Sequence, residues 1–358
     1  MPSLTEGWAA AYFGALVTVL VFAVGLQGLV YQVLVPDDLR VVVHRHREGF
    51  TPTYIASTIG LSAILFIWLL HPGDQSVGGS WQSFLGAAVI TISLGATVLY
   101  CMALTRRCNR PAVVDRLFRE ATQAGIRQLH EPAVADLAYL GQHGAAGAEK
   151  DLVLHTLSKL ADLVQADPAY AGSELEDIVA AVTETLLSDE HPGSDANFIS
   201  GAAILAKVIR QSADRRMKDC PDVAVALRSA TRLAVHAVRR QSDAVVFSFF
   251  NLGEQRSIML YSIGIESVDA KRFRLAMAAL SKLESAAKPA NSYEPYLAGL
   301  LARFWASGES ARNEAGKALR RLSAIDRDAF ARSAEYHQSR GDFETSDAIR
   351  ALIADHWP

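Results

Sequence analysis

The sequence predicts an all-α protein in which three N-terminal transmembrane helices precede a cytosolic helical domain. The prediction rests on charge, hydropathy and periodicity. Residues 1–104 of the 358-residue chain hold only three of its 35 Lys and Arg residues and five of its 38 Asp and Glu residues. They also contain three long uncharged apolar runs. From residue 111 onward, apolar residues recur with the period of an α-helix, and no segment alternates as a β-strand does.

Composition excludes several classes of protein. Hydrophobic residues make up 50% of the chain, its three Cys are scattered and its formal net charge is −3. These values exclude collagen, intrinsic disorder, a disulfide scaffold and a strongly basic nucleic-acid binder. Nucleic acid is therefore not expected as a partner.

A transmembrane helix needs about 20 mostly apolar residues to cross a hydrocarbon core of about 30 Å. The predicted spans are 8–35, 54–70 and 81–104, and none of them contains a charged residue. We reject a cleavable signal peptide for the first span, because no Lys or Arg precedes the run and it is longer than a signal core. Residues 1–110 are therefore interpreted as a membrane domain, and residues 111–358 as a cytosolic domain.

The short loops carry positive charge on one side of the predicted membrane only. The interfacial loop 36–53 and the segment after the third span each hold three arginines, whereas residues 1–7 and the loop 71–80 hold none. Because positive loops stay inside, the N-terminus should lie outside and the C-terminal domain in the cytoplasm, in a bacterial inner membrane. The arginines expected to contact the inner leaflet are Arg40, Arg45, Arg47, Arg106, Arg107 and Arg110.

Four polar side chains inside the spans are the candidates for contacts within the membrane: Gln27, Gln32, Ser93 and Thr97. They either form hydrogen bonds between helices or line a pore in an oligomer. The spans also carry small residues four positions apart, which predicts close helix packing within one chain or between copies. The sequence is thus compatible with a homo-oligomer as well as with a monomer.

In the cytosolic part, Pro and Gly divide the chain into predicted helices of 12–20 residues. The expected breaks are at 167–168, 191–193, 220–221, 288–289 and 307–308. Ser173 and Glu176 form a capping box that predicts a helix start. The most apolar segment, 244–265, is interrupted by Glu254 and Arg256, so we expect a buried helix pair there rather than a fourth span.

Two sequence comparisons favour helical repeats. Residues 137–160 align without gaps with 260–283, and both segments contain a Gly at the fifth position and end in Leu-Ser-Lys-Leu. Residues 336–343, with Gly341, Asp342 and Phe343, resemble the corner between the two helices of a tetratricopeptide repeat. The cytosolic part thus resembles HEAT and tetratricopeptide solenoids in general, which implies an extended concave surface that binds proteins.

No local motif for nucleophilic, metal or phosphate chemistry is present, so no catalytic residue, cofactor or metal site is predicted. His44 and His46 are interpreted as part of a solvated charge run, and His130, His143 and His155 as surface or capping side chains. The cysteines are expected to be free thiols. Basic pairs at 215–218, 239–240, 271–274 and 320–321 are interpreted as solvated helix faces.

The expected function follows from the domain layout. We expect an integral membrane anchor or adaptor whose helical-repeat domain, residues 111–358, binds a protein partner or senses a signal. The alternative is an oligomeric membrane effector or channel gated by the cytosolic domain, as in a bacterial toxin or defence system. An enzyme is not predicted.

Overall fold

The computed structural model describes residues 35–45, 108–123 and 131–357, with gaps at 146, 167–172, 189–191, 215–220, 251, 253–256, 288–293 and 322–326, and a few scattered residues before position 108. These residues form 14 helices and no strand, which confirms the all-α prediction. The chain divides into two compact units, residues 1–116 and residues 117–358.

The three predicted spans lie outside the described residues, apart from scattered positions. Among the helices that are described, none has both the length and the apolar character needed to cross a membrane. Gln27, Gln32, Ser93 and Thr97 also lie outside the described part of the chain.

In the first unit, helix α2 (Asp37–Arg45) lies within the segment that was predicted as an interfacial loop. Asp37 and Asp38 occupy its first turn, where carboxylates favour the positive end of the helix dipole. The side chain of Arg40 forms an ion pair with Asp37 at 2.8 Å. Helix α5 (Arg110–Gln123) begins with Arg110, whose guanidinium pairs with Asp38.

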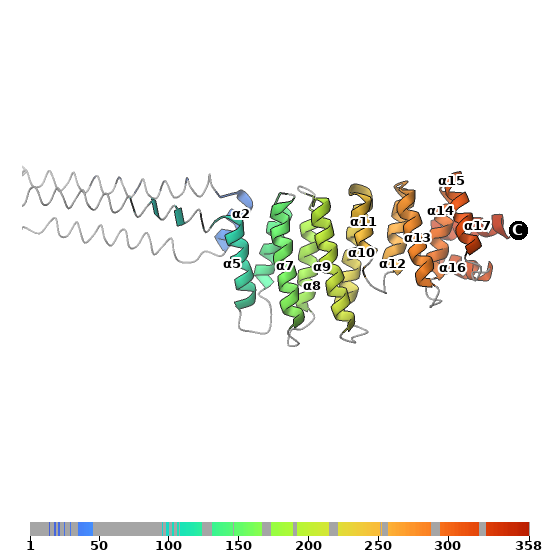
Figure 1. Ribbon diagram of the computed structural model, residues 1–358, viewed down its shortest axis with the longest axis horizontal. Coiled ribbons are helices and arrows are strands. Elements are labelled where there is room, and N and C mark those ends of the chain that lie inside the picture. Colours follow the sequence, from blue (N-terminus) through green and yellow to red (C-terminus); the bar gives the residue numbers. More distant parts are fainter. Residues whose placement is uncertain are drawn as a thin grey trace, which may run out of the picture. The chain divides into compact units, whose positions relative to one another are not determined.

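In the described part of the second unit, twelve helices follow α5 in chain order (Figure 1). They are α6 (Glu131–His143), α7 (Ala148–Ala166), α8 (Ser173–Leu186), α9 (Asp195–Asp214), α10 (Pro221–Arg240), α11 (Asp243–Phe249), α12 (Ser257–Asp269), α13 (Phe273–Ala287), α14 (Glu294–Ala306), α15 (Glu309–Arg321), α16 (Arg327–Ser339) and α17 (Phe343–His356). Helices α6, α8, α10, α12 and α14 each pack on the next in that row, and α7, α9 and α11 form a second row. Every substantial contact joins helices no more than three positions apart in this order.

The predicted helix breaks are confirmed. Four of the five fall between consecutive helices, and the fifth, 220–221, meets the start of α10 at Pro221. Helix α8 begins at Ser173, as its capping box indicates. Residues 244–265 form two helices, α11 and α12, as predicted. The two helices do not pack substantially on each other, however, because α11 packs on α9 and α10, whereas α12 packs on α10, α13 and α14.

Two helix pairs of the second unit have the same layout. Helices α12 and α16 are equal in length, and each is followed, after a corner of equal length, by its partner, α13 or α17. The turns match as well, because Lys271 and Gly341 have positive φ angles of 56° and 79°. Arg272 and Asp342 then donate their backbone N–H groups to the carbonyls of Ser267 and His337, which occupy equivalent positions in the two first helices.

The corners between paired helices are tied to one another by side chains from later pairs. Asn197 is fully buried and bonds both the N–H and the carbonyl of Gly147, at the α6–α7 corner. Gln241 donates to the carbonyl of Gly193, before α9, at 3.2 Å. Arg272 in turn donates to the carbonyl of Gln241 at 2.9 Å and pairs with Asp243. Successive pairs are therefore fixed at their ends as well as through their apolar faces.

Candidate functional site

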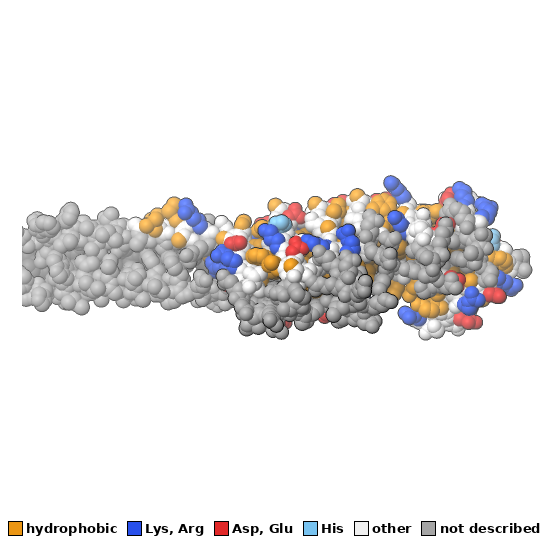
Figure 2. Space-filling view, turned by 60° about the horizontal axis from the view of Figure 1, so that its bottom comes forward, with side chains coloured by type: hydrophobic (Ala, Val, Ile, Leu, Met, Phe, Trp, Pro, Cys, Tyr) orange, Lys and Arg blue, Asp and Glu red, His pale blue; other side chains and the backbone are white. Residues whose placement is uncertain are grey.

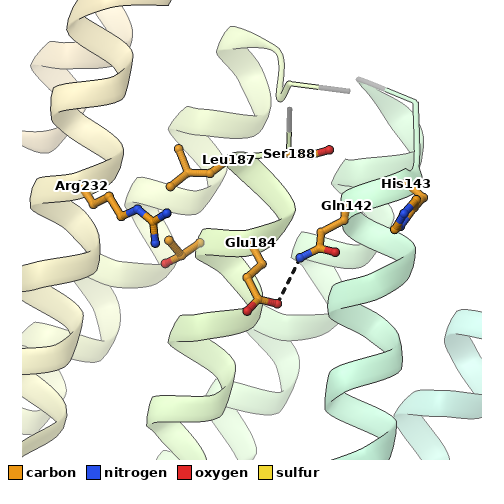
Figure 3. Close-up of a pocket in the computed structure, with 7 residues that line it drawn as sticks. Gln142, His143, Glu184, Leu187, Ser188 and Arg232 are labelled. Carbon is orange, nitrogen blue, oxygen red and sulfur yellow. Dashed lines mark hydrogen bonds between the residues drawn. The ribbon is translucent and has the colours of Figure 1, made fainter. Parts of the chain in front are cut away.

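A polar hollow of about 290 Å³ lies where α6, α8 and α10 meet. Its volume is close to the lower end of the range of ligand pockets, about 300–1,000 Å³. The residues that line it are Gln142, His143, Thr183, Glu184, Leu187, Ser188 and Arg232 (Figure 3). All three helices belong to the same row, so the hollow is formed between neighbouring pairs.

A buried lysine holds together two of the helix ends that form the hollow. Lys150, at the start of α7, is fully buried and donates from Nζ to the carbonyl oxygens of Gly141 in α6 and Thr185 in α8, the latter at 2.7 Å. The C-terminal end of a helix carries partial negative charge and unpaired carbonyls, which an ammonium group satisfies. Lys150 therefore fixes the ends of α6 and α8 side by side.

Glycine allows these two helices to approach closely. A Cβ atom at Gly141 would clash with the side chain of Thr185, and would lie 2.9 Å from the Cβ of that residue. Gly264, which aligns with Gly141 in sequence, takes the same role in α12, where a Cβ would clash with the methyl groups of Leu300 in α14. The aligned glycines thus mark equivalent contacts between neighbouring helices of one row.

The charged groups of the hollow come from different helices. Glu184 of α8 accepts a hydrogen bond from the side-chain amide of Gln142 in α6 at 3.3 Å. Arg232 of α10 stands on the other side of Glu184 (Figure 3) and forms no hydrogen bond or ion pair with any residue that the structure describes. His143 is half-buried and bonds through Nδ1 to the carbonyl of Tyr139 at 2.9 Å.

The two helices beside the hollow carry opposite charge. From residue 223 to its end, α10 has four arginines and no acidic residue, and Arg228 and Arg232 lie one turn apart on its exposed face. On α8, Asp177 and Glu184 lie two turns apart on one face, and burial together with the charges of Glu131 and Glu176 raises the pKa of Asp177. In the face seen in Figure 2, acidic and basic side chains are intermixed.

The six arginines predicted to contact the membrane are not equivalent in the structure. Arg106 is exposed, whereas Arg40 donates to the carbonyl of Val35 at 2.8 Å in addition to its ion pair with Asp37. The side chain of Arg110 is only 10% exposed in its ion pair with Asp38. The side chain of Arg45 lies outside the described residues, as do Arg47 and Arg107.

The histidines do not form a metal centre in the described residues. His143 lines the hollow and His155 is exposed on α7, while His130 and His46 lie outside the described part. Among the residues that the structure describes, no three His, Cys, Asp or Glu side chains are grouped to hold a metal ion. Cys108 is a free thiol, as predicted, and burial raises its pKa.

Two of the basic pairs are engaged in ion pairs between helices. Arg239 pairs with Glu266 of α12, and Arg272 pairs with Asp243 of α11. Arg320 is exposed, and residues 215–218 and Arg321 have no described side chains. The described pairs therefore do not supply a continuous basic strip.

A second polar cluster joins the last three helix pairs. His337 is buried and faces acceptors on both ring nitrogens, the carboxylate of Asp342 at 3.1 Å and the carbonyl of Pro295 at 2.9 Å. Tyr261 donates to the same carboxylate at 3.1 Å, and burial raises the pKa of Tyr261. Because its members bond one another across α12, α14, α16 and α17, we interpret this cluster as structural.

The sequence analysis interpreted His143 as a surface or capping side chain and did not identify any residue of the hollow as a site residue. Glu184 and Arg232 are far apart in the sequence, and no short motif connects them. The spacing of Arg228 and Arg232 in a helix without acidic neighbours was the available signal. No protein-family model, curated protein or solved structure shows significant similarity to this chain.

Proposed function

We propose that this protein is a membrane-anchored adaptor whose helical second unit binds a protein partner. In this proposal three spans, 8–35, 54–70 and 81–104, hold the chain in a bacterial inner membrane with the helical unit in the cytoplasm. The arginines at 40–47 and 106–107 face the inner leaflet, whereas Arg110 is held in its ion pair with Asp38.

Exposed apolar side chains support the membrane part of the proposal. Val21 and Leu29 in the first segment are 67% and 59% exposed, and Leu99 in the third is 69% exposed. A water-soluble domain gains free energy by burying such side chains, whereas lipid solvates them. Their exposure is what a lipid-facing helix surface requires.

The arrangement of the helices supports a helical-repeat domain. First helices of equal length begin at Ser257, Glu294 and Arg327, at similar intervals along the chain. Each packs on the neighbouring pair, and contacts stay between near neighbours, as in solenoids. Such domains present extended surfaces on which partner proteins bind.

One observation carries the proposal furthest. Three neighbouring helices of one row, α6, α8 and α10, jointly form a hollow that contains Arg232, a cation without a partner among the described residues. An exposed site shared by successive pairs is suited to a ligand that lies across them.

Purification of the full-length chain in mild detergent, with native mass and mass spectrometry read together, tests this function. We expect a discrete complex that contains a different protein at fixed stoichiometry. A ring of several copies without another protein would overturn the adaptor and favour the channel. In that case, substitution of Gln27 or Gln32 should change the conductance of bilayers that contain the protein.

A further inference from the structure

We infer that the hollow between α6, α8 and α10 binds an extended segment of a partner protein that carries an acidic and a basic side chain a few residues apart. The acidic side chain of the partner forms an ion pair with Arg232, and the basic side chain forms one with Glu184. This inference rests on the proposed adaptor function and names the chemistry of the partner.

Arg232 is available for a carboxylate. Its side chain is exposed, and it forms no ion pair with Glu184, which lines the same hollow. A guanidinium presents donors in a planar fork that matches a carboxylate in a bidentate manner. Arg228, one turn earlier on α10, adds positive charge to the same side.

Glu184 favours a cation on the opposite side of the hollow. It accepts one hydrogen bond, from Gln142, and a carboxylate has room for about four. A lysine or arginine of the partner would complete this side.

The small size of the hollow favours an extended segment over a folded surface. The hollow has room for a few side chains only, about 290 Å³. Leu187, half-buried at its edge, offers an aliphatic contact between the two charged sides. An extended segment can place neighbouring side chains on both charges at once.

The acidic groups of α8 disfavour ligands that are negative throughout. Glu176, Asp177 and Glu184 would repel nucleic acid, a polyacidic peptide or an anionic lipid surface that reached Arg232. The surface is thus selective for mixed charge.

The test is selection of displayed random twelve-residue peptides on the full-length chain in zwitterionic nanodiscs. With the native chain, the enriched peptides should contain an Asp or Glu within a few residues of a Lys or Arg. Selection on Arg232→Glu should lose the acidic position, and selection on Glu184→Lys should lose the basic position. The matched control is Arg320→Glu, the same exposed charge reversal on α15, which should leave the enriched peptides unchanged.

Fluorescence anisotropy then measures the affinity of the best mixed peptide. Arg232→Glu should weaken binding about 10- to 100-fold, since one charge-assisted hydrogen-bonded pair is lost. The inference is wrong if no peptide is enriched, if enriched peptides are acidic only, or if Arg232→Glu and Arg320→Glu behave alike. Binding of anionic vesicles that is lost in Arg232→Glu would instead assign the surface to lipid.

The two proposals fail in different ways. If the native complex persists with Arg232→Glu, the adaptor function stands and the hollow is not the site. If the full-length chain has no partner at all, both are overturned.

Discussion

Lys150 is a buried cation that organises a junction between helices. Its ammonium group bonds carbonyls at the ends of α6 and α8, beside the hollow. Lys150→Met keeps the aliphatic volume but removes these hydrogen bonds. We expect it to lower the free energy of unfolding by about 3 kcal/mol, because buried carbonyls lose their donor.

Denaturant unfolding of the full-length chain in detergent, followed by circular dichroism, measures this loss. The matched control is Lys159→Met on the same helix, where the side chain is exposed. Equal effects of the two substitutions would show that Lys150 contributes nothing through its bonds.

Asp342 predicts a pH dependence of stability. Burial raises the pKa of its carboxyl. Hydrogen bonds from Thr345 and Tyr261 and the charge of His337 together lower the pKa by more than burial raises it, so it lies below its ordinary value. A depressed folded-state pKa gives stability that is present above the unfolded value of about 3.9 and is lost as pH falls through the folded value.

The native chain should therefore lose thermal stability as the pH falls below about 4, and Asp342→Asn should lose less over the same window. Thermal unfolding midpoints between about pH 2.5 and pH 6 measure the difference. Asp355→Asn, an exposed carboxylate at the end of α17, is the control. Parallel curves for native chain and Asp342→Asn would contradict the interpretation of this cluster.

Gly141 and Gly316 allow the effect of helix packing on stability to be separated from the effect of helix propensity. Gly141→Ala places a Cβ against Thr185 and should destabilise the chain by about 1–3 kcal/mol, the usual cost of overpacking. Gly316→Ala in α15 meets its nearest atom, in the ring of Trp305, at 3.8 Å. It should stabilise the chain by about 0.5–1 kcal/mol through helix propensity.

The two substitutions are compared by the same denaturant unfolding. A double variant, Gly141→Ala with Thr185→Ala, removes the crowded side chain and should recover part of the loss. If Gly141→Ala were as stabilising as Gly316→Ala, the close approach of α6 and α8 would be refuted.

Helix boundaries could be predicted because their signals are local. Pro and Gly at the breaks, the capping box at Ser173 and the Gly341-Asp342 corner act within a few residues. The layout shared by α12–α13 and α16–α17 could not be predicted from the sequence, because equivalent buried positions in the two helix pairs hold different residues. Gly264 corresponds to Ala334, and Ser267 to His337.

The hollow was predictable only in part, and the reason is physical. Its charges come from α8 and α10, which pack directly on each other, and Lys150 and Gly141 fix α6 beside α8. A single sequence shows that α10 is basic and that α8 is acidic. It does not show which faces of the two helices are adjacent.

For the whole molecule, the decisive prediction is topology. Cysteines are introduced singly at Ser3, Ser76 or Ser339 in a chain whose native cysteines are replaced. A membrane-impermeant maleimide should label Ser3→Cys and Ser76→Cys in intact cells, because positive-inside loops place these segments outside. Ser339→Cys should react only after the membrane is permeabilised. Labelling of Ser339→Cys in intact cells would reverse the orientation.

The confinement of helix contacts to near neighbours has a consequence for biosynthesis. The substantial packing contacts join helices no more than three positions apart, so a helix can form most of its packing once the next three have left the ribosome. An exception is Tyr261 of α12, whose hydroxyl bonds Asp342 and Thr345 and so waits for α17. Contact order is therefore low, a property associated with fast folding. The chain can acquire its structure in step with translation, and each finished pair offers a template for the pair that follows it.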